Sequence, residues 1–266
     1  MSKPTISVSG LNAFYGAKQV LKDINFEVQS GEIVVIMGGS GSGKSTLLNH
    51  MLGLRKPSSG DVVIDDVNIC QASSKQIFEL RKKMGVAFQG GALLSSMSVG
   101  DNVRLPLEQN TELDAATIDI MVRMKLELMN MSGTENLMPS ELSGGMVKRA
   151  GLARAVVMDP QLLFFDEPSA GLDPTTAVEL DDLILTLRDA MQMSVVVVTH
   201  ELESVFKIAD KILVLFGGEA VAFGTVDEIK NHPDERIQNL INRRPNTQKD
   251  EGEVYLNRLL NRGNGS

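Results

Sequence analysis

The apolar positions of this chain fall into two patterns, and both are typical of β-strands. Near the N-terminus apolar and polar residues alternate, which predicts half-buried strands around Ile6, Val8 and Leu11 and around Ile24, Phe26 and Val28. Elsewhere the apolar positions are continuous, as in strands buried on both faces; these runs cover residues 33–37, 162–165, 195–198 and 212–216. Gly217 and Gly218 follow the last run and predict a turn.

Helical spacing appears between these runs. Four apolar residues recur at the period of a helix directly before Gly53: Leu47, Leu48, Met51 and Leu52. Residues 176–191 also have helical character, and they lie between two of the strand runs. Alternating strands and helices predict an α/β fold with a mainly parallel sheet and helices on its faces.

The middle of the chain, from about 93 to 156, has no strand run and is rich in helix formers and methionine. We therefore expect a helical subdomain inserted into the α/β core. After about residue 229 the chain becomes polar, and residues 243–252 have the composition of a linker. The sequence thus predicts one large domain over residues 1–232 and a C-terminal extension over residues 233–266.

Composition and charge exclude several classes of function. The chain has 266 residues and 42% apolar content, which is ample for a folded core. Its net charge of −8, with no long Lys/Arg block, argues against nucleic acid as a partner. Cys70 is its single cysteine, so an intrachain disulfide and a cysteine metal cluster are excluded, which fits a reducing compartment.

From the sequence we expect neither a secretory signal nor a membrane span. Its N-terminus lacks a charged region followed by an apolar run, and the longest apolar runs are strand-sized rather than the roughly 20 residues that a bilayer requires. If the protein works at a membrane, we expect another chain to cross it.

The clearest candidate chemistry is a phosphate-binding loop of the pattern G-x-x-x-x-G-K-[S/T]. It consists of Gly38, Gly39, Ser40, Gly41, Ser42, Gly43, Lys44 and Ser45. The loop follows a buried strand and precedes a helix, so its backbone N–H groups and the helix N-terminus can face phosphates. We expect Lys44 to reach the β- and γ-phosphates and Ser45 to bind Mg²⁺.

Two carboxylates end the apolar run at residues 162–165. Asp166 is placed to hold Mg²⁺, and Glu167 is placed to polarise an attacking water as a general base. Strands often end in acidic residues, so the pair alone leaves both interpretations open. The phosphate loop upstream favours the functional one.

A second candidate anion site begins a helical segment that carries Lys148, Arg149 and Arg154. Ser143 can cap this helix, and the small residues Gly144 and Gly145 leave its N–H groups open. Taken alone, an ordinary helix start is the simpler interpretation.

The order of these elements along residues 5–225 resembles the ABC ATPases. The elements are the phosphate loop, Gln89 after an apolar strand, the L-S-G-G signature at residues 142–145, the strand ending in Asp-Glu, residues 169–173 and His200. The resemblance implies a P-loop NTPase core with a mainly parallel sheet, an antiparallel N-terminal β subdomain and an inserted helical subdomain. It also implies ATP and Mg²⁺ as ligands.

The resemblance assigns further roles. Gln89 would contact Mg²⁺ or the lytic water and report the nucleotide state to a transmembrane partner, His200 would hydrogen-bond the γ-phosphate, and Asp173 would lie in the loop joining two sites. Tyr15 would stack on adenine, although a tyrosine in a turn also serves for packing. The implied groups are the catalytic set Glu167, His200, Lys44 and Gln89, the ATP-binding residues 38–46 including Thr46, and the Mg²⁺ ligands Ser45, Gln89 and Asp166.

The signature lies too far along the chain, on the helical subdomain, to close the ATP site of its own copy. Phosphoryl transfer requires charge stabilisation around the γ-phosphate from several sides. We therefore expect a head-to-tail homodimer, in which one copy completes the ATP site of the other with Ser143, Gly144, Gly145 and Met146.

Residues 88–103 and 137–146 resemble the Mla-type ATPases, and Met146 replaces the glutamine that is usual at the end of the signature. This resemblance implies phospholipid as cargo, moved between the two membranes of a Gram-negative bacterium. It implies a place at the cytoplasmic face of the inner membrane, with a permease dimer, an MCE-domain protein and a STAS-domain protein. The ATPase itself is not expected to contact lipid.

Three alternatives remain. An ABC ATPase for amino-acid import or lipoprotein release fits less well at residues 88–103 and at Met146. A soluble ABC protein acting on DNA or ribosomes usually has two cassettes or a coiled-coil insertion, and this chain has neither. A regulatory cassette that only binds ATP would not need Glu167 and His200.

Two apolar groups have no assigned role. Seven methionines lie between Met97 and Met146, and they can fill the small subdomain's core or form a groove for a partner helix. A C-terminal cluster is too short to be a stable helix alone, so we expect it to dock on the other copy of the dimer; it comprises Val254, Tyr255, Leu256, Leu259 and Leu260.

Overall fold

The computed structural model describes residues 4–244. The chain divides into two compact units, residues 1–229 and residues 230–266. The C-terminal cluster at residues 254–260, and with it the expected docking on a second copy, lies outside the described residues.

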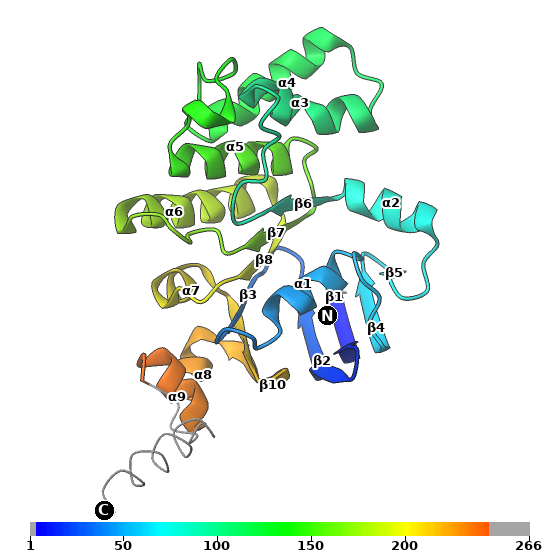
Figure 1. The fold of residues 1–266 in the computed structure, drawn as a ribbon, viewed down its shortest axis with the longest axis vertical. Helices are drawn as coiled ribbons and strands as arrows, with labels where there is room; N and C mark the ends of the chain where they lie inside the picture. The colour runs from blue at the N-terminus through cyan, green and yellow to red at the C-terminus, as the bar shows by residue number, and fades with distance from the viewer. Residues whose placement is uncertain (1–3, 245–266) are drawn as a thin grey trace, which may run out of the picture. The chain divides into compact units, whose positions relative to one another are not determined.

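A ten-stranded sheet runs through the first unit of the described chain, in the order β5-β4-β1-β2-β10-β9-β3-β8-β7-β6 (Figure 1). The strands are β1 (Ile6–Tyr15), β2 (Lys18–Val28), β3 (Ile33–Gly38), β4 (Ser59–Ile64), β5 (Val67–Asn68), β6 (Met84–Ala87), β7 (Leu162–Asp166), β8 (Ser194–Val198), β9 (Lys211–Phe216) and β10 (Glu219–Thr225).

Strand direction divides this sheet into a parallel and an antiparallel part. Strand β3 pairs in parallel with β8 and β9, and β7 pairs in parallel with β6 and β8. Strands β1, β2, β4 and β5 form an antiparallel part at the N-terminal end of the sheet. All six residues of β3 and all five of β8 are buried, as their continuous apolar runs predict. The predicted α/β fold class is confirmed.

The helices of the first unit connect the strands. They are α1 (Lys44–Met51), α2 (Ser74–Lys82), α3 (Val99–Asn110), α4 (Ala115–Leu128), α5 (Gly144–Val156), α6 (Pro174–Met191), α7 (Leu202–Ile208) and α8 (Val226–Lys230), with a 3₁₀ turn at Pro139–Glu141. Figure 1 shows α3, α4 and α5 gathered beyond the β6 edge of the sheet. All three helices lie within residues 93–156, the range in which the sequence predicts a helical subdomain.

Side-chain caps fix where helices α3, α4, α5 and α6 begin. Ser98 caps α3, Asp114 caps α4, Ser143 caps α5 and Asp173 caps α6, each by accepting a hydrogen bond from a backbone N–H of the first turn. The signature serine and the aspartate of the 169–173 segment therefore both stand at helix N-termini.

The seven methionines of the subdomain have mixed environments. Met129 and Met131 are buried in its core, Met124 has 62% of its surface exposed, and the remaining four are half-buried. Core packing therefore accounts for two of them.

The second unit contains one helix among its described residues, α9 (Glu235–Ile241). Asp234 caps it and binds the Arg236 guanidinium at 2.6 Å. The hydrogen bond from Arg236 is the largest cause that lowers the pKa of Asp234 to about 2.

Candidate functional site

The phosphate loop connects the buried end of β3 to the start of α1. A Cβ atom at Gly38 would lie 2.3 Å from the carbonyl oxygen of Leu215 on β9, so only glycine fits there. Gly43 has φ 104°, and a Cβ atom there would lie 2.6 Å from the Leu21 side chain of β2. The loop is thus held between β9 and β2, and its outer residues Gly39, Ser40 and Gly41 are exposed.

Lys44 lies over this loop. Its Nζ donates to the carbonyl oxygens of Gly38 at 2.8 Å and Gly39 at 3.2 Å. Burial lowers the pKa of Lys44, while the nearby Glu167 and Asp166 act in the opposite direction. Ser42 Oγ is buried and has no hydrogen-bond partner, which leaves a free polar atom in the loop. Ser45 is exposed and Thr46 is half-buried in the first turn of α1.

The two carboxylates stand where β7 ends, beside the phosphate loop. Burial raises the pKa of Asp166, the neighbouring Glu167 raises it further, and Lys44 opposes both. Glu167 has φ 49°, a left-handed conformation that is rare outside glycine. Its N–H donates to the carbonyl oxygen of Val198 at 2.8 Å, so the turn is fixed against the end of β8.

His200 faces Glu167 from the segment that follows β8. His200 Nδ1 lies 3.0 Å from Oε1 of Glu167 and forms a hydrogen bond with it. The same nitrogen lies 2.9 Å from Oε2, which has no hydrogen bond and is buried. Glu167 can accept this bond only if Nδ1 carries hydrogen, and Nε2 lies 3.5 Å from Oε1 of Glu201. The His200 side chain is 57% exposed and the Glu167 side chain only 15%.

The structure therefore brings four of the expected residues together at the C-terminal ends of β3, β7 and β8: Lys44, Asp166, Glu167 and His200. These come from three separate parts of the sequence. Such an edge is where ligands bind in open α/β sheets.

Gln89 is exposed in the loop that follows β6. Two residues later the loop is anchored on α5: Gly91 accepts a hydrogen bond from Arg154 at 3.1 Å, and a Cβ atom at Gly151 would lie 2.6 Å from the Gly91 carbonyl oxygen. The fully buried Asn102 then holds the rest of the loop through Leu94, whose N–H donates to Asn102 Oδ1 at 2.7 Å. Gln89 is thus tied to the helix that carries the signature.

The signature residues begin α5. Ser143 Oγ accepts from the Met146 N–H at 3.3 Å, and a Cβ atom at Gly144 would meet nothing within 4 Å. A Cβ atom at Gly145 would lie 3.0 Å from the Thr176 side chain at the start of α6. The exposed start of α5 therefore offers open backbone N–H groups away from the phosphate loop of its own copy.

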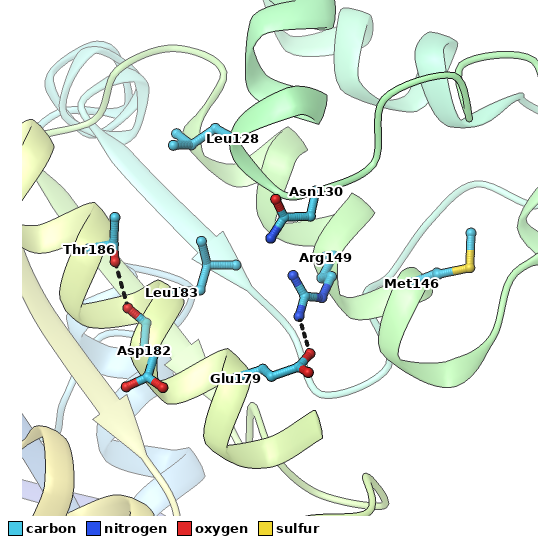
Figure 2. Close-up of a pocket in the computed structure, with 8 residues that line it drawn as sticks. All are labelled: Leu128, Asn130, Met146, Arg149, Glu179, Asp182, Leu183 and Thr186. Atoms are coloured by element: carbon cyan, nitrogen blue, oxygen red, sulfur yellow. Dashed lines mark hydrogen bonds and ion pairs between the residues drawn. The ribbon is translucent and has the colours of Figure 1, made fainter. Parts of the chain in front are cut away.

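Met146 lines a groove of about 700 Å³ between α4, α5 and α6 (Figure 2). Figure 2 shows Arg149 reaching across this groove to Glu179 on α6, where Nη2 and Oε2 are 2.7 Å apart. Leu128, Asn130, Asp182, Leu183 and Thr186 complete its lining.

Asp173 is exposed at the N-cap of α6. It accepts hydrogen bonds from the Thr176 hydroxyl at 2.6 Å and the Thr176 N–H at 3.0 Å. The hydroxyl bond is the largest cause that lowers the pKa of Asp173. This shapes the turn at residues 169–173 but leaves the carboxyl group at the surface.

Tyr15 ends β1 at the hairpin with β2, and 46% of its surface is exposed. The guanidinium carbon of Arg55 lies 3.9 Å from the centroid of the Tyr15 ring and covers one face. Tyr15 pairs with Lys18 on β2. On the same strand, the Leu21 side chain packs against Gly43 of the phosphate loop. The ring therefore belongs to the strand pair that borders the phosphate loop.

The oxygen groups of the site fit Mg²⁺. Asp166, Ser45 and Gln89 are hard oxygen ligands, the kind that Mg²⁺ prefers. Oε2 of Glu167 has no hydrogen bond, and burial together with Glu167 raises the pKa of Asp166, so the two carboxylates form an acidic pair beside Lys44. Among residues 4–244 no cluster of three or more His, Cys, Asp or Glu side chains could hold a metal alone. Phosphate and water oxygens would complete such a coordination shell.

Two residues near the site had no predicted role. Lys148 on α5 donates from Nζ to the carbonyl oxygens of Pro168 and Ala170, directly after Glu167. Asn102 organises the Gln89 loop. No local motif distinguishes either, because the contact partner of each is set by the tertiary fold.

Within the described part of the chain, no helix has the length and apolar content needed to cross a membrane.

Comparison with known proteins identifies the family. Residues 21–170 match the family model described as ABC transporter. The chain is 39% identical over 237 residues to the intermembrane phospholipid transport system ATP-binding protein MlaF of Haemophilus influenzae, covering 89% of this chain and 90% of the relative. It is 36% identical to the probable ribonucleotide transport ATP-binding protein mkl of Mycobacterium tuberculosis, covering 90% of this chain and 67% of the relative.

A solved structure agrees with both the fold and the family. It is the dimeric post-hydrolysis state of the ATP-binding cassette MJ0796 bound to ADP and Pi, with a TM-score of 0.77, 29% identity, and coverage of 83% of this chain and 98% of that one. The chain therefore belongs to the ABC transporter family, as an ATPase subunit of the type represented by MlaF.

Proposed function

We propose that this ATPase hydrolyses Mg²⁺-bound ATP in a head-to-tail homodimer and thereby drives the transport of phospholipid between the inner and outer membranes of a Gram-negative bacterium. The observation that carries the catalytic part is the pairing of His200 with Glu167 next to Lys44. The similarity to MlaF supports the phospholipid cargo.

Each residue of the site has a part in this scheme. Lys44 and the N–H groups of residues 38–46 bind the β- and γ-phosphates, which requires Lys44 to leave the carbonyl oxygens of its own loop. Glu167 accepts the proton of the attacking water, and its buried carboxyl group is held at a fixed angle by the turn at β7. His200 donates to the γ-phosphate from Nε2 and orients Glu167 from Nδ1, so in this scheme both ring nitrogens carry hydrogen.

Mg²⁺, when bound, would neutralise phosphate charge, and Ser45, Asp166 and Gln89 would hold it. Tyr15 offers the uncovered face of its ring to adenine. Residues 143–146 of the second copy close over the γ-phosphate with the open N–H groups of α5, and Asp173 lies in the loop between the two sites. The dimeric state of the similar MJ0796 cassette supports this arrangement.

The similarity to MlaF supports the remaining partners of this proposal. They are a permease dimer, an MCE-domain protein and a STAS-domain protein, with this chain at the cytoplasmic face of the inner membrane. Ribonucleotide is a second candidate cargo, because this chain is nearly as similar to the probable ribonucleotide transport protein mkl as it is to MlaF.

The catalytic assignment is tested by Glu167→Gln, with Glu203→Gln on the exposed side of α7 as a matched control. Loss of a general base should slow turnover by about 100-fold or more while ATP remains bound. Glu203→Gln should turn over like the unaltered protein. Rapid hydrolysis by Glu167→Gln in the assembled transporter would contradict the role of Glu167.

The cargo is tested by purifying the tagged chain from membranes and identifying the proteins that accompany it. A permease with an MCE-domain protein, and ATP-dependent movement of labelled phospholipid between vesicles, support the proposal. A complex that moves labelled ribonucleotide and leaves phospholipid in place would replace phospholipid with the second cargo.

A further inference from the structure

Lys148 connects the signature helix to the loop that carries Glu167. It lies in the second turn of α5, five residues after Ser143, and its Nζ donates to the carbonyl oxygens of Pro168 at 2.5 Å and Ala170 at 2.7 Å. These two carbonyls flank Ser169, whose buried Oγ has no hydrogen-bond partner. One ammonium group therefore spans the turn that follows Glu167.

This loop is a tight turn in which Pro168 and Ser169 are buried. Its backbone is closed by hydrogen bonds from Ala170 N–H to the Glu167 carbonyl at 3.3 Å and from Leu172 N–H to the Ser169 carbonyl at 3.1 Å. Glu167 and Gly171 both have positive φ, at 49° and 76°. A turn with such a strained backbone keeps one conformation only when contacts from outside the turn hold it.

The charge of Lys148 suits this position. Burial lowers the pKa of its ammonium, and the nearby Glu167 opposes that shift, so the two groups interact electrostatically. A half-buried ammonium is costly unless it is satisfied. Two carbonyl oxygens satisfy it here, and they belong to the loop that the active site requires to be rigid.

A second contact joins the same two segments. A Cβ atom at Gly145 would lie 3.0 Å from Thr176, the residue that holds Asp173 at the start of α6. The first two turns of α5 therefore contact the chain on both sides of the 169–173 segment.

We propose that Lys148 is a positioning residue for Glu167, which couples the signature of each copy to the catalytic carboxylate of the same copy. The proposal rests on the proposed role of Glu167 as the general base. When ATP at the opposite site engages Ser143, the start of α5 is fixed, and Lys148 passes that constraint to the loop after Glu167. Each copy's Glu167 would then be aligned only when the other site is occupied.

The test compares Lys148→Met with Lys148→Arg and with the control Lys125→Met in the assembled transporter. Lys125 also joins the helical subdomain to the core, through an ion pair with Asp159 before β7, but it does so away from Glu167. Lys148→Met should lower kcat by about tenfold or more and leave the KM for ATP within about twofold, because alignment and not binding is lost.

Lys148→Arg keeps a cation with several donors and should recover a large part of kcat. Lys125→Met should turn over like the unaltered protein. Thermal melts of all three variants, and ATP binding measured with a fluorescent analogue, separate misfolding from misalignment. Unaltered kcat in Lys148→Met would overturn the proposal, and so would an equal loss in Lys125→Met or a loss that appears in KM alone.

A double substitution separates this proposal from the assignment of Glu167. If Lys148 acts through Glu167, adding Lys148→Met to Glu167→Gln should change the residual turnover by less than about twofold. A further tenfold loss would show that Lys148 acts elsewhere. Rapid turnover of Glu167→Gln alone would refute the base assignment, whatever Lys148→Met does.

Discussion

The guanidinium of Arg154 donates from α5 to the carbonyl oxygen of Gly91, 3.1 Å away, and so fastens the loop of Gln89 to the signature helix. A second nitrogen of the same guanidinium lies 3.4 Å from Oδ1 of Asn102. The loop is therefore attached to the helical subdomain by a polar network of Arg154, Gly91 and Asn102.

Replacing Asn102 should loosen this loop. Asn102→Ala would leave the Leu94 N–H without its acceptor and the Met97 and Ser98 carbonyls without the amide donor, at a cost of about 1–3 kcal/mol for a buried unsatisfied group. Denaturant unfolding measures this loss. Asn110→Ala at the other end of α3 removes one hydrogen bond to the Pro106 carbonyl and should cost less. Equal stability of the two variants would contradict the central role of Asn102.

Tyr15 is expected to bind adenine through one face only. Tyr15→Ala should raise the KM for ATP by roughly 5- to 150-fold, the equivalent of the 1–3 kcal/mol that stacking of a base on an aromatic ring contributes. Tyr15→Phe keeps the ring and should retain the KM. Steady-state kinetics on both variants distinguish stacking from packing, because a packing role would lower thermal stability in Tyr15→Ala with no change in KM.

Asp181 introduces a pH dependence of stability. Its side chain is buried between α6 and α7, Oδ1 has no hydrogen-bond partner, and burial is the largest cause that raises its pKa. Ser204 and Lys207 oppose this shift and Asp182 adds to it. Because the folded-state pKa is raised, the neutral acid is favoured in the folded protein at low pH, and that stability is lost as pH rises through the folded-state pKa.

Asp181→Asn removes this titration. The variant should therefore gain thermal stability relative to the unaltered protein as pH rises from about 4 to about 8, with the smallest difference at the acidic end. Melting temperatures across that range provide the measurement. Glu203→Gln, on the exposed side of α7, serves as control. A stability difference that does not change with pH would show that Asp181 is ionised in the folded protein throughout.

The strands and the phosphate loop could be predicted because their signals are local. Continuous apolar runs identify β3, β7 and β8, and residues 38–45 carry their own motif. Helix α2 and the β4–β5 hairpin were not anticipated. For α2 a signal existed, since Ser73 and Gln76 form a capping box. The hairpin turns at Asp65 and Asp66, both with positive φ, and such a turn has no strong sequence signal without glycine.

The contacts of the site could not be predicted in the same way. His200 and Glu167 are 33 positions apart, and their meeting depends on β7 and β8 being neighbours in the sheet. Both partners of Lys148 and one of the two partners of Arg154 are backbone carbonyls, which every residue has. Sequence therefore identifies side chains with chemistry, whereas the fold decides which backbone atoms they reach.

The parallel pairing of β7 with β8 has a consequence for how this site can vary. Asp166 lies opposite Val198 in the ladder, so Glu167 and His200 each follow the last paired rung by one or two residues. Their separation is encoded by the count of residues in two strands and not by the identity of the apolar side chains within them. Val, Ile and Leu can exchange along both strands with little effect on the pair. Insertion or deletion of one residue in either strand would turn one partner to the opposite face of the sheet. The pair of Glu167 and His200 therefore requires that β7 and β8 keep their lengths.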